Sequence, residues 1–197
     1  MLAWGPVTHV TIAEKVVPHE YAEAFFAGTL APDCRGLWQE DGRHAKLHSP
    51  RLVRVLDILA NSPEKRAFAS GYKLHVIADA VEGSYSARRM ALGARYPADF
   101  MVDKLLAVDY GILPRRVEMS LSLKRFMSDA FLLAYPEAPL LTDDEIDDAF
   151  HMFNAYLQYG WMFLSTPQAD MRSWYGDYRL WMDEAINTYL AEVEAAR

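Results

Sequence analysis

The sequence predicts an all-α protein in which several helices pack irregularly into a single domain of residues 1–197. Apolar residues recur at helical spacing through most of the chain, and no stretch shows the period-two alternation of a half-buried strand. Prolines and glycines divide this pattern into about seven to nine helices, more than a simple four-helix bundle needs. With 197 residues and 52% hydrophobic content, the chain is long and apolar enough for one sizeable core.

Composition excludes several classes of function. The 27 acidic residues outnumber the 20 basic ones, and the net charge of -7 argues against binding to duplex DNA and against a polybasic membrane anchor. No apolar run is long enough to span a bilayer and the N-terminus lacks the pattern of a signal peptide, so we expect a cytoplasmic protein. A single cysteine, Cys34, excludes an internal disulfide, which leaves histidine and carboxylate as the available metal ligands.

The first expected helix follows a turn at residues 4–6. Thr8 is a suitable N-cap, and the apolar residues after it predict a helix that runs to about residue 17. His9 would then lie in the first turn, where the helix dipole favours the neutral imidazole that binds metals. A surface histidine in a turn fits the same local sequence.

The second expected helix, residues 20–27, ends at Gly28. Pro32 fixes its own φ and restricts the residue before it, so Asp33 is presented from a stiff loop. A stiff carboxylate suits a metal site, although an Asp after Pro also commonly caps the next segment. Cys34 is most simply a small, partly buried side chain.

Two histidines, His44 and His48, are four residues apart in a polar stretch. Both would face one way if the stretch is helical. We favour His48 as the ligand because it directly precedes Ser49-Pro50, the start of the next expected helix at residues 50–60.

The central expected helix starts at Ser62-Pro63 and ends near Gly83. It carries His75 and Asp79 on one face, about one turn (roughly 6 Å) apart. Zinc binds imidazole nitrogen and carboxylate oxygen, so this pair can contribute to a zinc site if other segments complete it. A hydrogen-bonded pair on a packed helix explains the same spacing.

The rest of the chain predicts four further helices, beginning near residues 96, 116, 142 and 167. Thr142 and Glu145 form a capping box for the third of these, which is expected to run to about residue 165. His151 follows Asp147 by four residues, and it is open whether it binds a metal, supports a ligand or pairs within its helix. The aromatic residues of the last third are expected in the core.

Four motifs in consistent order carry a resemblance to a known family. They are Trp4-Gly5 with Thr8-His9, the segment 28–33, the His44/His48 region and the segment 71–79. Together they resemble the bacterial zinc-dependent phospholipase C family and, more distantly, the single-strand-specific zinc nucleases. The resemblance covers roughly the first 80 residues, and the remainder is similar only in being helical.

The resemblance implies an all-α fold with a cluster of up to three zinc ions that hydrolyses phosphodiesters. It makes His9 a ligand of one zinc ion, assigns a second ion to Asp33, His75 and either His48 or His44, and makes Asp79 the carboxylate that bridges the two. The family's further histidine falls near Tyr85, and its later His-x-x-x-Glu pair has no counterpart because Ala155 stands four residues after His151, so we expect one or two ions.

The implied reaction is hydrolysis by metal-activated water, with Asp33 and Asp79 as catalytic carboxylates and Asp33 or Glu82 as the general base. The implied substrate is a small phosphate ester or a phospholipid head group. Two other readings remain: a metal-binding relative without turnover, and a helical interaction protein with incidental histidines. The sequence does not predict the oligomeric state.

Overall fold

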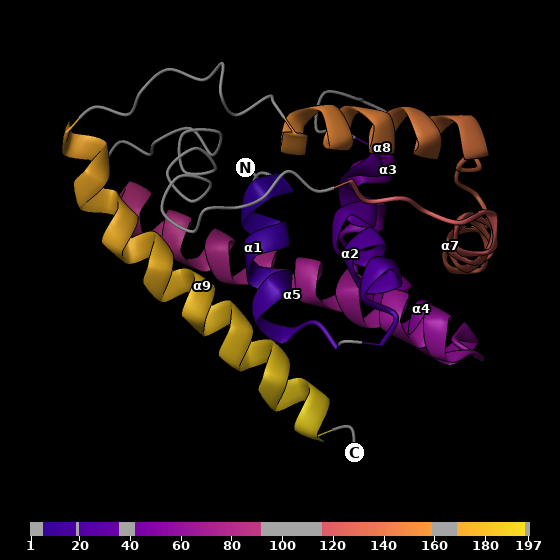
Figure 1. Ribbon diagram of the computed structural model, residues 1–197, viewed down its shortest axis with the longest axis horizontal. Helices are drawn as coiled ribbons and strands as arrows, with labels where there is room; N and C mark the ends of the chain where they lie inside the picture. The colour runs from indigo at the N-terminus through magenta and orange to yellow at the C-terminus, as the bar shows by residue number, and fades with distance from the viewer. Residues whose placement is uncertain (1–5, 19, 36–41, 92–115, 159–168, 196–197) are drawn as a thin grey trace. The chain divides into compact units, whose positions relative to one another are not determined.

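A computed structural model describes residues 6–18, 20–35, 42–91, 116–158 and 169–195. Within these ranges more than four fifths of the residues are helical, and they form eight α-helices and one 3-10 helix without any strand (Figure 1). The predicted all-α class is therefore confirmed. The helix expected to begin near residue 96 lies outside the described residues.

The helices are α1 (Pro6–Val16), α2 (Ala22–Leu30), η1 (Ala31–Cys34), α3 (Arg43–Leu47), α4 (Pro50–Leu59), α5 (Pro63–Ala91), α7 (Leu121–Ala134), α8 (Asp143–Gln158) and α9 (Ala169–Ala195). Residue contacts group them into two compact units. One unit contains α1, α5 from Ile77 onwards and α9; the other contains α2 to α4, α5 up to Val76, α7, and α8 up to Asn154. The long helix α5 thus belongs to both units.

Within the second unit, α2 and α5 cross at a pair of glycines. A Cβ atom on Gly28 would collide with the backbone carbonyl of Phe68, and one on Gly71 would collide with the carbonyl of Phe25. The two helix backbones are therefore in direct contact, which only glycine permits. The expectation that Gly28 ends its helix is wrong, because α2 continues to Leu30 and uses the glycine for packing.

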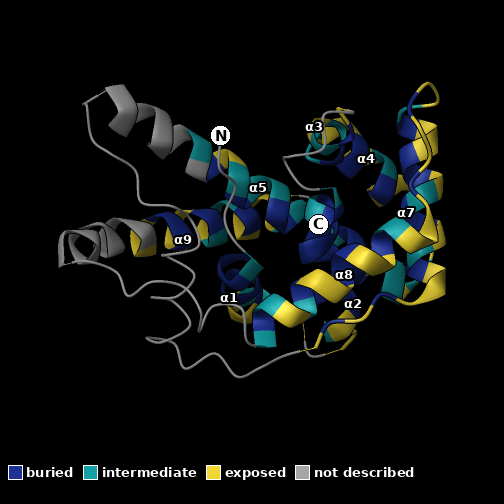
Figure 2. Ribbon diagram, turned by 90° about the horizontal axis from the view of Figure 1, so that it is seen from above, coloured by how far each residue is buried: buried dark blue, intermediate teal, exposed yellow. Residues whose placement is uncertain are grey.

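In the same unit α4 packs against α7, and a serine caps each of them. The Ser49 side chain accepts from the Leu52 amide and the Ser120 side chain accepts from the Leu123 amide. α4 buries Leu52, Val53 and Leu56. Figure 2 shows that buried and exposed residues alternate along α7 and α8.

The N-terminal helix begins earlier than the sequence predicts. Pro6 occupies the first position of α1, which tolerates proline, so Thr8 lies inside the helix and is not its N-cap. Residues 7–13 are all buried, and within its unit α1 packs against α9. His9 is therefore a core residue and not a surface one, with 1% of its area exposed.

The predicted capping box of α8 is present. The Thr142 amide donates to the Glu145 carboxylate at 3.0 Å, and the Glu145 amide donates to the Thr142 hydroxyl at 3.2 Å. α5 is longer than expected, because it passes Gly83 and continues to Ala91. None of the described helices has an apolar stretch long enough to cross a membrane.

Candidate metal centre

Three side chains of the second unit converge on one point: Asp33 from η1, His48 from the end of α3, and His75 from α5. The His48 Nε2 atom lies 3.0 Å from the His75 Nε2 atom and 3.2 Å from Asp33 Oδ1, and His75 Nε2 lies 3.8 Å from the same oxygen. His75 is fully buried, whereas the side chains of His48 and Asp33 are 15% and 17% exposed. The group therefore borders the protein surface.

The local folding explains why these side chains meet. The glycine crossing brings the last turn of α2 against α5, and η1 follows α2 directly, so the stiff Pro32-Asp33 turn lies close to the face of α5 that carries His75. η1 also packs against α3, whose C-cap residue is His48.

Backbone carbonyls hold both imidazoles. His75 Nδ1 lies 2.7 Å from the Thr29 carbonyl oxygen, and His48 Nδ1 lies 2.9 Å from the His44 carbonyl oxygen. A carbonyl can only accept, so each Nδ1 carries the proton and donates it. In a neutral imidazole the Nε2 atom then presents its lone pair. Such an Nδ1–H to carbonyl bond is the usual support of a metal-binding histidine.

The two Nε2 atoms consequently face each other as acceptors at 3.0 Å, beside a carboxylate oxygen. Three electron-pair donors at this range repel one another unless a cation lies among them. That cation is either a proton, which makes one ring an imidazolium, or a metal ion.

The distances fit a tetrahedral metal ion. With zinc–nitrogen and zinc–oxygen bonds of about 2.0 to 2.2 Å, two ligand atoms of a tetrahedral site are about 3.3 to 3.6 Å apart. The three separations of 3.0, 3.2 and 3.8 Å lie close to this edge length. Asp33, His48 and His75 could therefore form one face of a metal site and leave a fourth position open.

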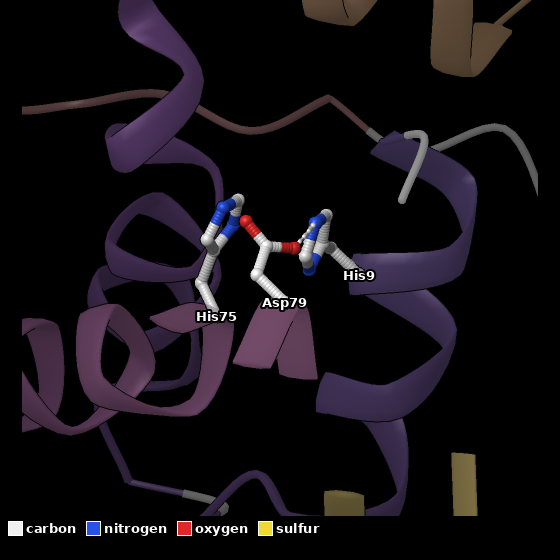
Figure 3. Close-up of side chains that lie close together, drawn as sticks. All are labelled: His9, His75 and Asp79. Atoms are coloured by element: carbon white, nitrogen blue, oxygen red, sulfur yellow. Dashed lines mark ion pairs between the residues drawn. The ribbon is translucent and has the colours of Figure 1, made fainter. Parts of the chain in front are cut away.

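A second pair lies in the other unit. His9 of α1 is 3.4 Å from Asp79 of α5, measured from Nε2 to Oδ1. This is longer than an ordinary N–H to oxygen hydrogen bond and equals the separation of two ligand atoms on a tetrahedral ion. Figure 3 shows His75 and Asp79 projecting from α5, with a dashed line between Asp79 and His9. On α5, Asp79 lies one turn after His75 and pairs with His9.

Other candidate residues lie elsewhere. His44 is outside both groups. Its ring contacts that of His48 in a tilted arrangement with centroids 4.2 Å apart, and its Nδ1 donates to the Arg35 carbonyl at 2.8 Å. His151 is an exposed residue of α8 and belongs to no described group of metal ligands. The side chains of Glu82 and Tyr85 lie outside the described residues.

Cys34 is buried beside Asp33 but is not a ligand of either group. Burial raises the pKa of its thiol from 9.0 to about 12, and the nearby Asp33 carboxylate adds to the effect. The thiol therefore stays protonated near neutral pH, and a protonated thiol is a poor metal ligand.

Sequence reasoning missed an ionic cluster around Glu145. Its carboxylate accepts from Arg43 at 2.8 and 3.1 Å and from Arg35 at 2.7 Å. Partial burial opposes ionisation, but the Arg43 hydrogen bond, the Thr142 amide and the two guanidinium charges outweigh it and lower the pKa of Glu145. The partners are about 100 residues apart, so no local pattern indicates them.

No protein-family model, curated protein or solved structure matches this chain. The likeness to zinc-dependent phospholipases C stays a prediction from the motifs. The described residues themselves establish an all-α fold and His/Asp groups that could hold a metal ion.

Proposed function

We propose that this protein is a metal-dependent hydrolase of phosphodiesters, of the phospholipase C type, with zinc as its metal. One observation carries the proposal: two buried or half-buried imidazoles direct their Nε2 atoms to one place beside a carboxylate, while backbone carbonyls accept from both Nδ1 atoms. Packing alone does not require two imidazoles to direct their Nε2 atoms at each other beside a carboxylate.

The donor set favours zinc over magnesium or calcium, which prefer oxygen ligands. Two imidazoles and one carboxylate are also the ligands of a familiar class of catalytic zinc sites, which keep a fourth position for water or substrate. When bound, zinc supplies a Lewis acid that lowers the pKa of water toward 7 and offsets the charge of a phosphate.

The chain's own residues would fix the metal-binding imidazoles and accept a proton from water. Thr29 and His44 fix the two rings through their carbonyls. The second carboxylate oxygen of Asp33 would accept a proton from the attacking water. His9 and Asp79 would supply ligands for a second ion.

The charge of the chain limits the substrate. With a net charge of -7, the protein attracts phosphate groups only where a local cation offsets that charge. We therefore place the phosphate of a small ester or phospholipid head group at the metal centre, and expect no binding to duplex nucleic acid.

The test is hydrolysis of bis(4-nitrophenyl) phosphate by tag-free protein, before and after removal of metal with a chelator and after return of zinc. We expect activity that the chelator abolishes and zinc restores, and that His75→Ala lacks under all three conditions. His151→Ala is the matched control, because this histidine is exposed and far along the chain on α8, so the variant should keep full activity.

Each alternative has its own result. Bound zinc without any turnover would indicate a metal-binding protein that is not a phosphodiesterase. Absence of bound zinc, with stability that does not respond to chelator, would indicate that a proton joins His48 and His75 and that the protein is a helical structural or interaction module.

A further inference from the structure

Glu145 binds the two stretches of chain that supply Asp33 and His48. Arg35 comes two residues after Asp33, and Arg43 comes five residues before His48. Both guanidinium groups donate to the Glu145 carboxylate, Arg35 to Oε1 at 2.7 Å and Arg43 to both oxygens. One side chain of α8 thus holds the end of η1 and the start of α3 together.

The same cluster continues by hydrogen bonds to a candidate ligand. The Arg35 carbonyl accepts from His44 Nδ1 at 2.8 Å, and the His44 carbonyl accepts from His48 Nδ1 at 2.9 Å. The Arg43 side chain also donates to the Leu140 carbonyl at 2.8 Å and is only 6% exposed. α3 has five residues, too few for a stable helix by itself, so its position depends on these contacts.

We propose that Glu145 is a positioning residue of the metal centre, which keeps Asp33 and His48 at binding distance by clamping Arg35 and Arg43. This inference rests on the proposed metal centre and adds a residue that the ligand motifs do not contain. Glu145 lies in the first turn of α8, which a capping box fixes, so the clamp is anchored on a rigid element.

A matched control exists on the same short helix. Lys46 of α3 pairs with Glu137 at 3.4 Å, but the Glu137 side chain is 65% exposed. Solvent screens such a pair, and it contributes little. Glu145→Gln and Glu137→Gln therefore each remove one carboxylate charge that faces α3, and only the first removes the clamp.

The first measurement is zinc affinity, from competition between the full-length protein and a chromophoric chelator. Loss of a group that orients a ligand typically weakens metal binding about 10- to 100-fold, so we expect at least a tenfold loss for Glu145→Gln and none for Glu137→Gln. Equal affinity of Glu145→Gln and the wild type would overturn the proposal.

The second measurement separates positioning from general support of the fold. Nitrogen NMR of the metal-free protein reports which ring nitrogen of each histidine carries the proton. In Glu145→Gln we expect His44 and His48 to lose their preference for Nδ1–H, while His75 keeps it through the Thr29 carbonyl. If all three change together, or none does, the proposal is wrong.

Two outcomes call for a second measurement: a Glu145→Gln variant that does not fold, and a wild type that binds no zinc. Should Glu145→Gln fail to fold, Glu145→Asp keeps the charge and the capping carboxylate but cannot reach both arginines, and the same two criteria apply to it. Should the wild type bind no zinc, the proposed function fails, and the imidazole measurement alone decides the role of Glu145.

Discussion

Replacement of Gly71 by alanine tests the helix crossing on which the candidate site depends. The new Cβ atom would overlap the Phe25 carbonyl, a backbone atom that cannot rotate away. α2 and α5 would have to move apart by about 1.5 Å to reach a normal contact distance. The Thr29 carbonyl, which accepts from His75 Nδ1 at 2.7 Å, would move with α2.

The expected loss of stability is about 2 kcal/mol. Overpacking a well-packed contact costs about 1 to 3 kcal/mol, and the upper value applies because two backbones collide. Alanine regains about 1 kcal/mol over glycine in a helix interior. The net loss corresponds to a melting temperature lower by about 4 to 8 °C for a chain of this size.

Urea unfolding followed by circular dichroism, in the presence of chelator, measures this loss. Gly42→Ala is a useful comparison, since Gly42 has a φ of 71° and no neighbour near its missing Cβ, so only backbone strain of about 1 kcal/mol is expected. Because Gly28 and Gly71 belong to one crossing, the double alanine variant should lose less than the sum of the single losses. A Gly71→Ala protein as stable as the wild type would refute the described crossing.

Three further predictions concern single side chains. Asp79→Asn should melt like the wild type in chelator yet lose at least one metal equivalent and phosphodiester hydrolysis; an unfolded metal-free variant would show that Asp79 is structural. Cys34 should resist thiol reagents at pH 8 until the protein unfolds, and rapid labelling of the folded protein would contradict this. Because folding raises the pKa of its thiol from 9.0 to about 12, the stability that the buried thiol contributes is complete below pH 9 and declines as the pH rises toward 12. Folding lowers the pKa of Glu145 from 4.5, so the stability that its carboxylate contributes is present above about pH 4.5 and disappears as the pH falls further. In urea titrations at several pH values, the free energy of unfolding of Glu145→Gln should therefore fall less steeply with acid than that of the wild type. An unchanged pH dependence would count against the ionic cluster.

The fold could be predicted where the signal is local. The Ser62-Pro63 start of α5, the Ser49 cap of α4 and the capping box of α8 depend on residues within one turn, and all three are present. The role of Gly28 could not be predicted, because a glycine that ends a helix and a glycine that packs against another helix look the same in the chain. The contact with α5 decides between them.

At the candidate site, too, local signals could be predicted from the sequence and long-range contacts could not. The types and spacing of Asp33, His75 and Asp79 are informative, and the position of His48 before Ser49-Pro50 favours it over His44. The structure places the His48 ring in the group and the His44 ring against it. The clamp around Glu145 joins residues about 100 positions apart, and such ion pairs leave no periodic pattern for sequence reasoning to detect.

Zinc binding itself is the most direct test of the central claim. Tag-free protein is stripped with chelator, returned to zinc, and its metal content and melting temperature are measured beside His48→Ala and His75→Ala. We predict at least one tightly bound equivalent in the wild type, with a stabilisation of about 2.7 kcal/mol when free zinc is 100 times the dissociation constant. Both variants should lose the bound ion and the stabilisation. A wild-type protein that takes up no zinc and melts identically with and without it would contradict the metal centre.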